Sequence, residues 1–340
     1  MALSKILPAS QEQYAGARNL IINGAFECWQ RSVSVSSQTG SGYKTADRWR
    51  TNSSGGTYNQ SRQTVPLGDS VVGDFKYFLR HQVTTGDNFT GIQQRIEDVQ
   101  SVAEGTVTLS FYAKGTNPNA GSIAIGTNQN FGTGGSPSTN VEVQDAATFT
   151  VTSSWQRFNF QLTVASISGK TLGTNGDSYF QIQFTQAGGD ASTDAWTLDI
   201  TGVQLELGDT ATPFEHRSFA DELARCQRYY EKSYNYGTAV GTSTYLGAIT
   251  MGGGTTGSTT SFSPLLCPQY KVRKRTAPTV TVYDPAGTSG KVQRWQLGIT
   301  NSNGHTGTLV DISETNFKVY SNSGANSSGI TCHYEATAEL

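Results

Sequence analysis

The side chains that could do chemistry are few and scattered in this chain of 340 residues. The four histidines, His81, His216, His305 and His333, form no recognisable catalytic constellation with a serine or cysteine. The sequence has neither the H-E-x-x-H pattern of zinc proteases nor the G-x-S-x-G pattern of serine hydrolases. Its carboxylates are dispersed, so spacing alone selects no glycosidase pair. We therefore predict no catalytic residue.

Aromatic rings in polar segments are the other candidates, because flat rings stack on sugar faces while amides and hydroxyls bind the sugar hydroxyls. Five aromatic residues lie in or near such segments: Tyr43, Tyr58, Tyr77, Tyr245 and Trp295. We predict that the residues that contact glycan belong to this set. The alternative is that most of the five fill the core or an interface, where aromatic side chains of β-sandwiches are usually found.

Cysteine spacing and charge narrow the classes of partner. The four cysteines, Cys28, Cys226, Cys267 and Cys332, form no metal-binding spacing, so we expect four reduced thiols. The net charge of −2 provides no basic field for nucleic acid. The first ten residues lack the apolar stretch of a signal peptide, and no apolar run is long enough to span a membrane. We expect a protein made in the cytoplasm, without nucleic-acid partners or membrane insertion.

The elements that must position these side chains are mostly strands. Charged residues make up 15% of the chain, against about 25% in ordinary globular proteins, and 38 residues are glycine. Polar, uncharged composition of this kind favours strands and tight turns. Strands are predicted at 19–24, 106–112, 122–125, 155–162, 179–184 and 196–207. Their two-residue alternation predicts antiparallel sheets with one buried and one solvated face.

One segment, residues 216–232, has helical periodicity instead. Ser218 is a candidate N-cap, with Asp221 and Glu222 in the first turn. Four residues at helical spacing share one face: Phe219, Leu223, Cys226 and Tyr230. This stripe must be buried against a sandwich or against its own copies around a symmetry axis. We predict an oligomer interface at these four residues, and a homotrimer.

The predicted elements divide the chain into four segments. Residues 1–18 have no sustained periodicity and are predicted to be a docking arm. Residues 19–212 form the larger β-domain, and residues 213–236 contain the helix. A stretch rich in Gly, Ser and Thr then leads into a smaller β-domain at 237–340, with strands predicted at 279–283, 295–299, 317–320 and 330–334.

Several stretches carry a resemblance to a known group of proteins. Residues 19–27, Asn-Leu-Ile-Ile-Asn-Gly-Ala-Phe-Glu, with Ala46-Asp47-Arg48-Trp49 downstream, resemble the opening of phage tail and virion proteins that have a carbohydrate-binding-module-like jelly roll. Residues 110–115 and 155–162 resemble the middle of that fold. Residues 198–208, followed by Ala-Thr-Pro-Phe-Glu at 211–215, resemble its last strand. Residues 225–230 are similar to the helix that follows, and 335–340 to the C-terminal end.

The resemblance implies an all-β protein with an N-terminal jelly-roll β-sandwich, one amphipathic linker helix and a smaller C-terminal β-sandwich. It implies a bacteriophage virion protein, a tail-fibre or spike-type subunit that contributes to attachment to host surface glycans. Residues 1–18 would then dock on other virion proteins. Two alternatives stay open: a capsid decoration or head-fibre protein that binds other virion proteins, and a glycan-degrading tail enzyme. Against the enzyme, the sequence shows no long β-helix repeat.

A metal site is also implied, because jelly rolls of this kind often hold a structural Ca²⁺ between the first loop and the last strand. The matching carboxylates are Glu27 and Asp199, and hard oxygen ligands suit Ca²⁺. The alternative is that Glu27 pairs with Arg31 or Arg48 while Asp199 faces solvent, since Ca²⁺ takes about six to eight ligands. No other cofactor is expected.

Overall fold

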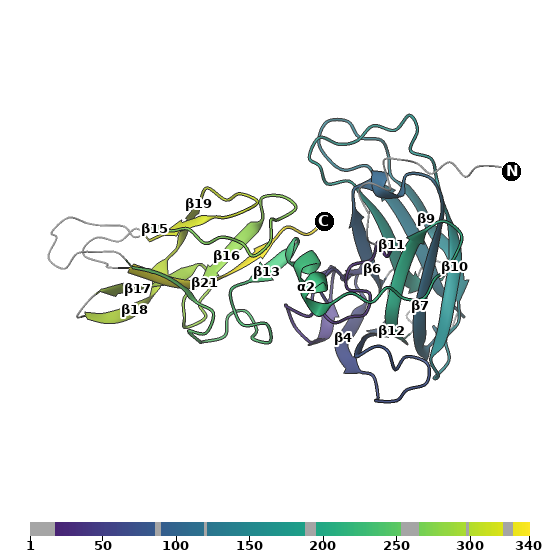
Figure 1. Ribbon diagram of the computed structural model, residues 1–340, viewed down its shortest axis with the longest axis horizontal. Coiled ribbons are helices and arrows are strands. Elements are labelled where there is room, and N and C mark those ends of the chain that lie inside the picture. The colour runs from purple at the N-terminus through teal and green to yellow at the C-terminus, as the bar shows by residue number, and fades with distance from the viewer. Residues whose placement is uncertain are drawn as a thin grey trace. The chain divides into compact units, whose positions relative to one another are not determined.

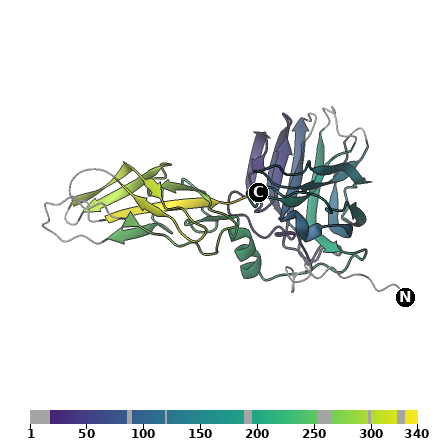
Figure 2. The same cartoon turned by 90° about the horizontal axis from the view of Figure 1, so that it is seen from above.

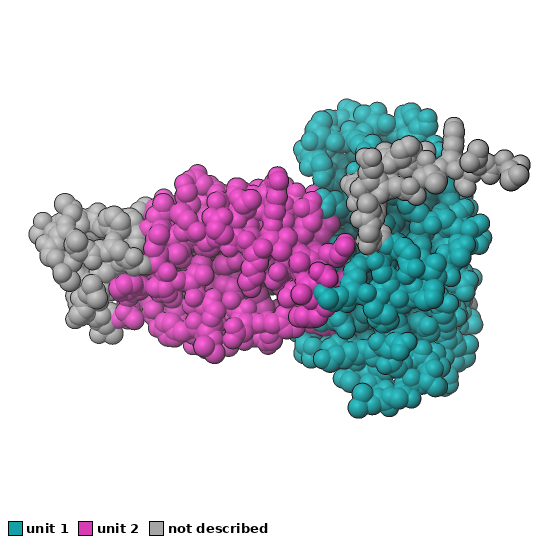
Figure 3. Space-filling view, in the orientation of Figure 1, with its two compact units in different colours: residues 1–28, 32–218, 340 teal, residues 29–31, 219–339 magenta. Residues whose placement is uncertain are grey.

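The computed structural model describes residues 18–85, 90–118, 121–187, 195–252, 265–296, 299–321 and 329–340. The chain forms two compact units (Figure 3): residues 1–28, 32–218 and 340 make unit 1, and residues 29–31 and 219–339 make unit 2. Except for Arg18, the predicted docking arm 1–18 lies outside the described residues. The unit boundary at 218/219 falls inside the segment 213–236 that was predicted to contain the helix. In the described ranges, no helix is both long and apolar enough to cross a bilayer.

Unit 1 consists of two six-stranded antiparallel sheets (Figures 1 and 2). Sheet A has the strand order β1 (Ser34–Thr39), β4 (Thr57–Thr64), β5 (Tyr77–Thr85), β12 (Trp196–Leu207), β7 (Gly105–Thr116) and β10 (Gln156–Val164). Sheet B has the order β2 (Gly42–Tyr43), β3 (Arg50–Ser53), β6 (Thr90–Glu97), β11 (Tyr179–Gln186), β8 (Ile123–Asn130) and β9 (Val141–Phe149). A short 3₁₀ helix, η1 (Val99–Val102), follows β6. The predicted all-β architecture is confirmed.

Aromatic side chains from both sheets meet in the core of unit 1. The ring of Phe111 in β7 lies 5.0 Å from that of Phe184 in β11 and 5.1 Å from that of Phe149 in β9, centroid to centroid. Because side chains alternate across a strand, Phe184 places the even-numbered residues of β11 in the core. The odd-numbered residues, Gln181 and Gln183 among them, therefore lie on the outer face of sheet B.

Five of the six strands predicted in unit 1 are present, and the exception is residues 19–24. The prediction that each strand is solvated on one face is wrong for the two central strands, β11 and β12. β11 is buried from Tyr179 to Thr185, and β12 is buried from Leu198 to Glu206. Their alternate polar residues are thus enclosed by protein. Since a buried polar group needs a hydrogen-bond partner, the partners of these side chains become informative.

The polar residues near the end of β12 are bonded by the chain that follows them. The Glu206 carboxylate accepts from the backbone N–H of Thr212 at 3.0 Å and from its hydroxyl at 2.5 Å. The Gln204 side-chain oxygen accepts from the backbone N–H of Glu215 at 2.8 Å. The Glu215 carboxylate in turn accepts from the backbone N–H of Asn19 at 2.7 Å. We call these bonds between residues 19–24, 204–206 and 212–217 the terminal lock.

Residues 19–24 complete the terminal lock beside β12. They were predicted to be a strand ending in a hairpin turn, but no regular strand forms there. Instead, Leu20 N–H donates to the Leu205 carbonyl at 2.9 Å, and Val203 N–H donates to the Gly24 carbonyl at 3.0 Å. A Cβ at Gly24 would lie 2.1 Å from the Val203 oxygen, so glycine is needed for this approach.

Unit 2 contains one α-helix among its described residues, α2 (Phe219–Gln227), and a β-structure centred on β21 (Gly329–Thr337). The remaining strands are β13 (Tyr230–Lys232), β14 (Ile249–Gly252), β15 (Leu265–Leu266), β16 (Thr279–Tyr283), β17 (Lys291–Gln296), β18 (Ile299–Thr306), β19 (Thr308–Val310) and β20 (Lys318–Tyr320). β21 pairs with β13 and β16 through its second half and with β14 and β17 through its first. A second sheet has the order β15-β20-β19.

Residues 29–31 belong to unit 2 although their neighbours in sequence belong to unit 1. The Gln30 side chain donates to the Tyr230 carbonyl at 3.0 Å, and the Lys232 ammonium donates to the Gln30 carbonyl at 2.5 Å. Arg31 forms an ion pair with Glu339 at 3.0 Å. Unit 2 is therefore completed by a segment that lies almost 200 positions before β13 in the sequence.

The helix is shorter than predicted, which changes the proposed interface. α2 ends at Gln227, and Tyr230 is the first residue of β13. Cys226 and Tyr230 are buried in the single chain, Leu223 is half-buried, and Phe219 is 46% exposed. The four residues therefore do not form one free stripe, because two of them are already buried in the single chain. The homotrimer stays a prediction.

A buried ion pair stands in the interior of unit 2. Glu231 of β13 and Lys274 have side chains with 0% exposure, and their charged groups are 2.5 Å apart. The Tyr334 hydroxyl donates to Glu231 at 2.6 Å, and the backbone N–H of Lys271 donates to both carboxylate oxygens. Burial lowers the pKa of Lys274, whereas the Glu231 carboxylate opposes that shift. Charge pairing thus holds three segments of unit 2 together.

We expect Glu231→Gln to destabilise unit 2 by about 3–5 kcal/mol, because it leaves the Lys274 ammonium buried without a counter-ion. Urea denaturation of the full chain measures the change, and combining it with Lys274→Met should restore most of the loss. Arg273→Gln is the control, because it breaks the Arg273–Glu314 pair, whose arginine is 72% exposed, and should cost less than about 1 kcal/mol. Equal losses from Glu231→Gln and Arg273→Gln would contradict the assignment.

Unit 1 contains a buried histidine, His81 of β5. Its ring lies 5.5 Å from that of Tyr58 and 5.6 Å from that of Trp196, and its Nδ1 is 3.2 Å from the Gln60 amide nitrogen. Complete burial lowers the pKa of His81 to about 3. The folded chain therefore holds this ring neutral at pH values where the unfolded chain protonates it.

We expect His81 to make unit 1 sensitive to acid. Above about pH 6.5 both states carry a neutral ring, and stability is lost as the pH falls from 6.5 toward 3, by up to about 1.4 kcal/mol per pH unit. His81→Gln should give a shallower slope of unfolding free energy against pH over this window. The control variant is His305→Gln, because His305 lies in unit 2. Its slope is measured on the unfolding transition of unit 1. Parallel slopes for His81→Gln and the unchanged protein would rule out the role.

Candidate functional site

The five aromatic residues predicted to contact glycan do not form one site. Tyr58 was wrongly assigned to the surface: it is fully buried in β4, where its hydroxyl donates to the Gly40 carbonyl at 3.1 Å. Tyr77 begins β5 of sheet A, with the Arg62 guanidinium 4.6 Å from its ring centre. Tyr43 forms part of β2 in sheet B and is half-buried. Tyr58 is therefore a core residue, while Tyr43 and Tyr77 belong to different sheets.

The other two predicted aromatic residues belong to unit 2. Tyr245 is 60% exposed, and its hydroxyl accepts from the Gln293 side-chain amide at 2.5 Å. Trp295 of β17 is half-buried against Gly329, where a Cβ would lie 2.5 Å from the indole. Tyr245 is thus available to a ligand, whereas Trp295 contributes much of its ring to packing.

A group of polar and aromatic side chains lies on sheet B. The strand register places Tyr43, Arg50, Gln93 and Gln183 in one row across β2, β3, β6 and β11. The next row holds Arg95, Gln181 and Asn128 of β6, β11 and β8. With Tyr179 they make up what we call the outer face of sheet B: Tyr43, Arg50, Gln93, Arg95, Asn128, Tyr179, Gln181 and Gln183.

Hydrogen bonds order part of this face. Arg95 Nε donates to the Gln181 side-chain oxygen at 3.2 Å, and the Gln181 nitrogen donates to the Gln183 oxygen at 3.1 Å. The Arg95 guanidinium also lies 4.5 Å from the ring centre of Tyr179. Gly126 of β8 leaves room for Gln183, because a Cβ there would come within 2.5 Å of the Gln183 nitrogen. The side chains are therefore held in fixed directions before any ligand arrives.

Other polar atoms of this face have no hydrogen-bond partner in the part of the chain that the structure describes. They are both amide atoms of Gln93, the side-chain nitrogen of Gln183 and the side-chain oxygen of Asn128. Gln93 is 1% exposed, and each buried unpaired group costs about 1–3 kcal/mol. Such groups are normally satisfied by water or by a ligand. The outer face of sheet B thus contains unused donors and acceptors.

This face is also electrostatically distinctive. Burial lowers the pKa of Arg50, and the nearby Arg95 lowers it further, while Tyr43 and Tyr179 raise it. Among the described residues, the Arg50 side chain makes one long hydrogen bond, 3.5 Å from Nη1 to the Asn52 side-chain oxygen. Signals for these residues were present in the sequence as Gln93-Gln94-Arg95 and as the alternating glutamines at 181 and 183. These residues were not predicted as a site because the polar face of each strand was expected to be solvated.

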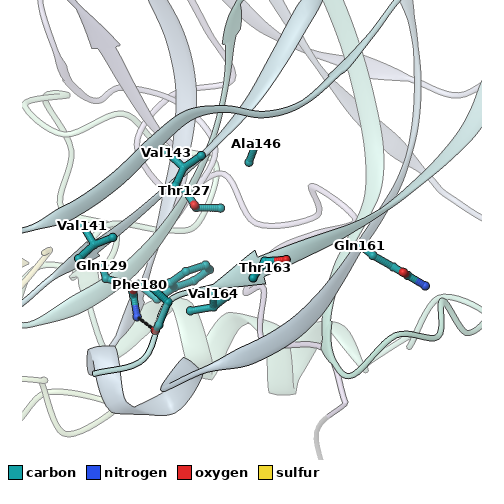
Figure 4. Close-up of a pocket in the computed structure, with 10 residues that line it drawn as sticks. Thr127, Gln129, Val141, Val143, Ala146, Gln161, Thr163, Val164 and Phe180 are labelled. Atoms are coloured by element: carbon teal, nitrogen blue, oxygen red, sulfur yellow. Dashed lines mark hydrogen bonds between the residues drawn. The ribbon is translucent and has the colours of Figure 1, made fainter. Parts of the chain in front are cut away.

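A cavity of about 380 Å³ opens between β8 and β9 of sheet B and the edge of β10 (Figure 4). Its lining is Thr127, Gln129, Val141, Val143, Ala146, Gln161, Thr163, Val164, Ala165 and Phe180. The Gln129 side chain crosses one end of it, donating to the Ala165 carbonyl at 2.8 Å. The lining has no carboxylate, histidine, lysine or cysteine, so it offers no general acid or base.

Among the described residues, a serine and a histidine meet in β18 of unit 2. The Ser302 hydroxyl lies 2.7 Å from His305 Nε2, and burial together with Arg294 and Lys291 lowers the pKa of His305. A triad also needs a carboxylate that orients the ring, and no described carboxylate bonds to His305. This pair therefore lacks the third member that activates a nucleophile.

The carboxylates predicted to hold Ca²⁺ have a different setting. Both Asp199 oxygens accept from the Arg80 guanidinium, each at 2.7 Å, and this contact raises the pKa of Arg80. Glu27 is half-buried and already takes part in another interaction. Among the described residues, no group of three or more His, Cys, Asp or Glu is placed to hold a metal ion. The Ca²⁺ site stays a prediction, with the Arg80 ion pair as a competing role for Asp199.

The four predicted free thiols agree with the structure, in which all four cysteines are unpaired. Cys28, Cys226 and Cys332 are buried and Cys267 is exposed.

Comparison with known proteins gives structural likeness only. No family model matches the sequence, and no curated protein matches it either. Among solved structures, the chain is similar to the enzymatically active domain of tailspike protein 4 from Bacteriophage CBA120 (14% identity, TM-score 0.31, 56% of this chain). The chain spans about a fifth of that tailspike chain, 21% of its length.

Two further structures are similar over nearly their whole length. A putative sugar binding protein from Bacteroides thetaiotaomicron gives 13% identity and a TM-score of 0.33, over 55% of this chain and 99% of the other. TmCBM61, in complex with β-1,4-galactotriose, gives 13% identity and a TM-score of 0.29, over 56% and 98%. Likeness at this level does not identify a function for this chain.

We expect Asp199→Asn to lower the unfolding free energy by about 1 kcal/mol or less, because Arg80 is 42% exposed and its pair with Asp199 is screened by solvent. Thermal unfolding in Ca²⁺ and in EDTA separates this from a metal site. A Ca²⁺-dependent rise in Tm that both Glu27→Gln and Asp199→Asn abolish would establish the predicted site. A loss in Asp199→Asn that is independent of Ca²⁺ would establish the ion pair alone.

Proposed function

We propose that the outer face of sheet B binds a glycan chain. The observation that carries the proposal is Gln93, a buried amide on this face whose donor and acceptor are both unmatched among the described residues. Because Gln93 is 1% exposed, a ligand would reach it only by displacing the side chains that cover it. Sugar hydroxyls donate and accept at once, so they complement amide groups of this kind. Tyr43 and Tyr179 add flat rings, and Arg50 and Arg95 add planar donors.

The same proposal places the protein in a bacteriophage virion, as a tail-fibre or spike-type subunit that attaches to host surface glycans. Support comes from the motifs of the terminal lock and their resemblance to phage tail and virion proteins. Glycan contacts are weak singly, and several copies on one particle would raise the avidity without new contacts. A homotrimer would provide such copies. Locating the protein on intact particles by cryo-electron microscopy would separate the tail from the capsid, where a decoration protein would lie.

Gln93→Leu tests the proposed function, because leucine fills a similar volume without unmatched polar atoms. We expect the variant to be as stable as the unchanged protein, or about 1–2 kcal/mol more stable, since a buried unpaired amide has been removed. Its affinity for a glycan that the unchanged protein binds should fall about tenfold, the equivalent of one hydrogen-bonding group. An immobilised oligosaccharide panel and urea denaturation measure the two effects.

The control is Gln161→Leu, which alters an exposed glutamine of β10 in sheet A. It should leave glycan binding unchanged. If Gln93→Leu binds glycans normally but is strongly destabilised, then Gln93 serves the fold and the proposed function is wrong.

A further inference from the structure

Two arginines on the outer face of sheet B have almost no partners. Arg50 lies directly across from Gln93, and Arg95 follows Gln93 by two positions on the same face of β6. Arg50 and Arg95 are therefore diagonal neighbours, about 7–8 Å apart between their Cα atoms. Among described residues, neither guanidinium forms an ion pair with a carboxylate. Two like charges are therefore held close together and half-buried.

The hydrogen-bonding capacity of these arginines is nearly unused. A guanidinium has five N–H donors. Arg50 makes the single 3.5 Å bond to Asn52, and Arg95 uses only its Nε, in the bond to Gln181. No described group accepts from the terminal nitrogens of Arg95. The donors that remain are in the paired geometry that binds both oxygens of a carboxylate.

The charge balance of this face also favours an anion. Arg50 has a lowered pKa because it is partly desolvated and close to Arg95, and no carboxylate offsets that effect. Glu97 lies on the same face beyond Arg95, opposite Tyr179, but it already has an interaction of its own. Glu142 is exposed on the edge strand β9. A bound anion would thus relieve a repulsion that the free protein retains.

From this arrangement we infer that the glycan bound by the outer face of sheet B is acidic, and that Arg50 and Arg95 bind its carboxylate groups. The inference rests on the proposed function. Gln181 and Gln183, which are buried, would hold Arg95 in position, while Tyr43 and Tyr179 would lie beside the sugar rings. The two arginines would then determine specificity, since a neutral sugar leaves both guanidinium groups unpaired.

Matched oligosaccharides test the inference on the full chain. The probes are oligomers of galacturonate, of glucuronate and of N-acetylneuraminate, with the methyl ester of each as the neutral counterpart and a glycerol phosphate oligomer as the phosphate probe. We expect at least one acid to bind about tenfold or more tightly than its ester in calorimetric titration, with an affinity that falls as salt rises. Tight binding of the phosphate probe alone would overturn the assignment to carboxylates.

Variants assign the effect to the two arginines. Arg50→Gln and Arg95→Gln should each weaken acid binding about tenfold and change ester binding less than twofold. The affinity of Arg50→Lys for the acid should lie between those of the unchanged protein and Arg50→Gln, because lysine keeps the charge but not the paired donor geometry. Arg157→Gln, on the exposed face of β10, removes the same charge from sheet A and should have no effect.

Failure of this inference differs from failure of the proposed function. If an ester or a neutral oligosaccharide binds as well as the acid and Gln93→Leu weakens it, the face binds glycan and the acidic assignment is wrong. If no probe of any charge binds, both are wrong.

Discussion

A buried amide must find a hydrogen-bond partner, and the two central strands of unit 1 meet this requirement in different ways. In β12 the following segment of the chain supplies the partners, since the backbone N–H groups of Thr212 and Glu215 donate to the side chains of Glu206 and Gln204. In β11 and its neighbour β6, Gln181 bonds to Gln183 and Arg95, and the amide of Gln93 remains unmatched within the described residues. One sequence pattern, polar residues at alternate positions, thus yields a structural lock in sheet A and a candidate binding face in sheet B.

The terminal lock also gives a physical meaning to the stretches that resemble phage tail and virion proteins. Residues 19–24 and 212–217 are far apart in the sequence, yet they bond to each other and to the end of β12. Their residue types follow from these bonds: a glycine where two backbones touch and a carboxylate where an N–H needs an acceptor. The residues that carry the resemblance are therefore explained by the bonds of the terminal lock, and the resemblance does not by itself identify a ligand.

The sequence predicted the strands well, because alternation depends on local geometry that tertiary contacts rarely change. It predicted burial poorly. Tyr58 appeared to lie in a polar loop and is core, and the helix was extended to residue 232 because Tyr230 continued its spacing although that residue begins β13. The candidate site was missed for a related reason: only cross-strand register brings Arg50, Gln93 and Gln183 into one row, and register depends on pairings between distant segments.

The placement of residues 29–31 in unit 2 has a mechanical consequence. The chain passes between the two units at 28/29, 31/32 and 218/219, so three covalent crossings join them where a simple tandem protein has one. A pulling force applied across the molecule would be divided among these crossings, and the bonds of Gln30 and Arg31 inside unit 2 would resist extraction of the first loop. Cutting the chain at 218/219 would therefore not release a complete unit 2, because residues 29–31 would remain with unit 1.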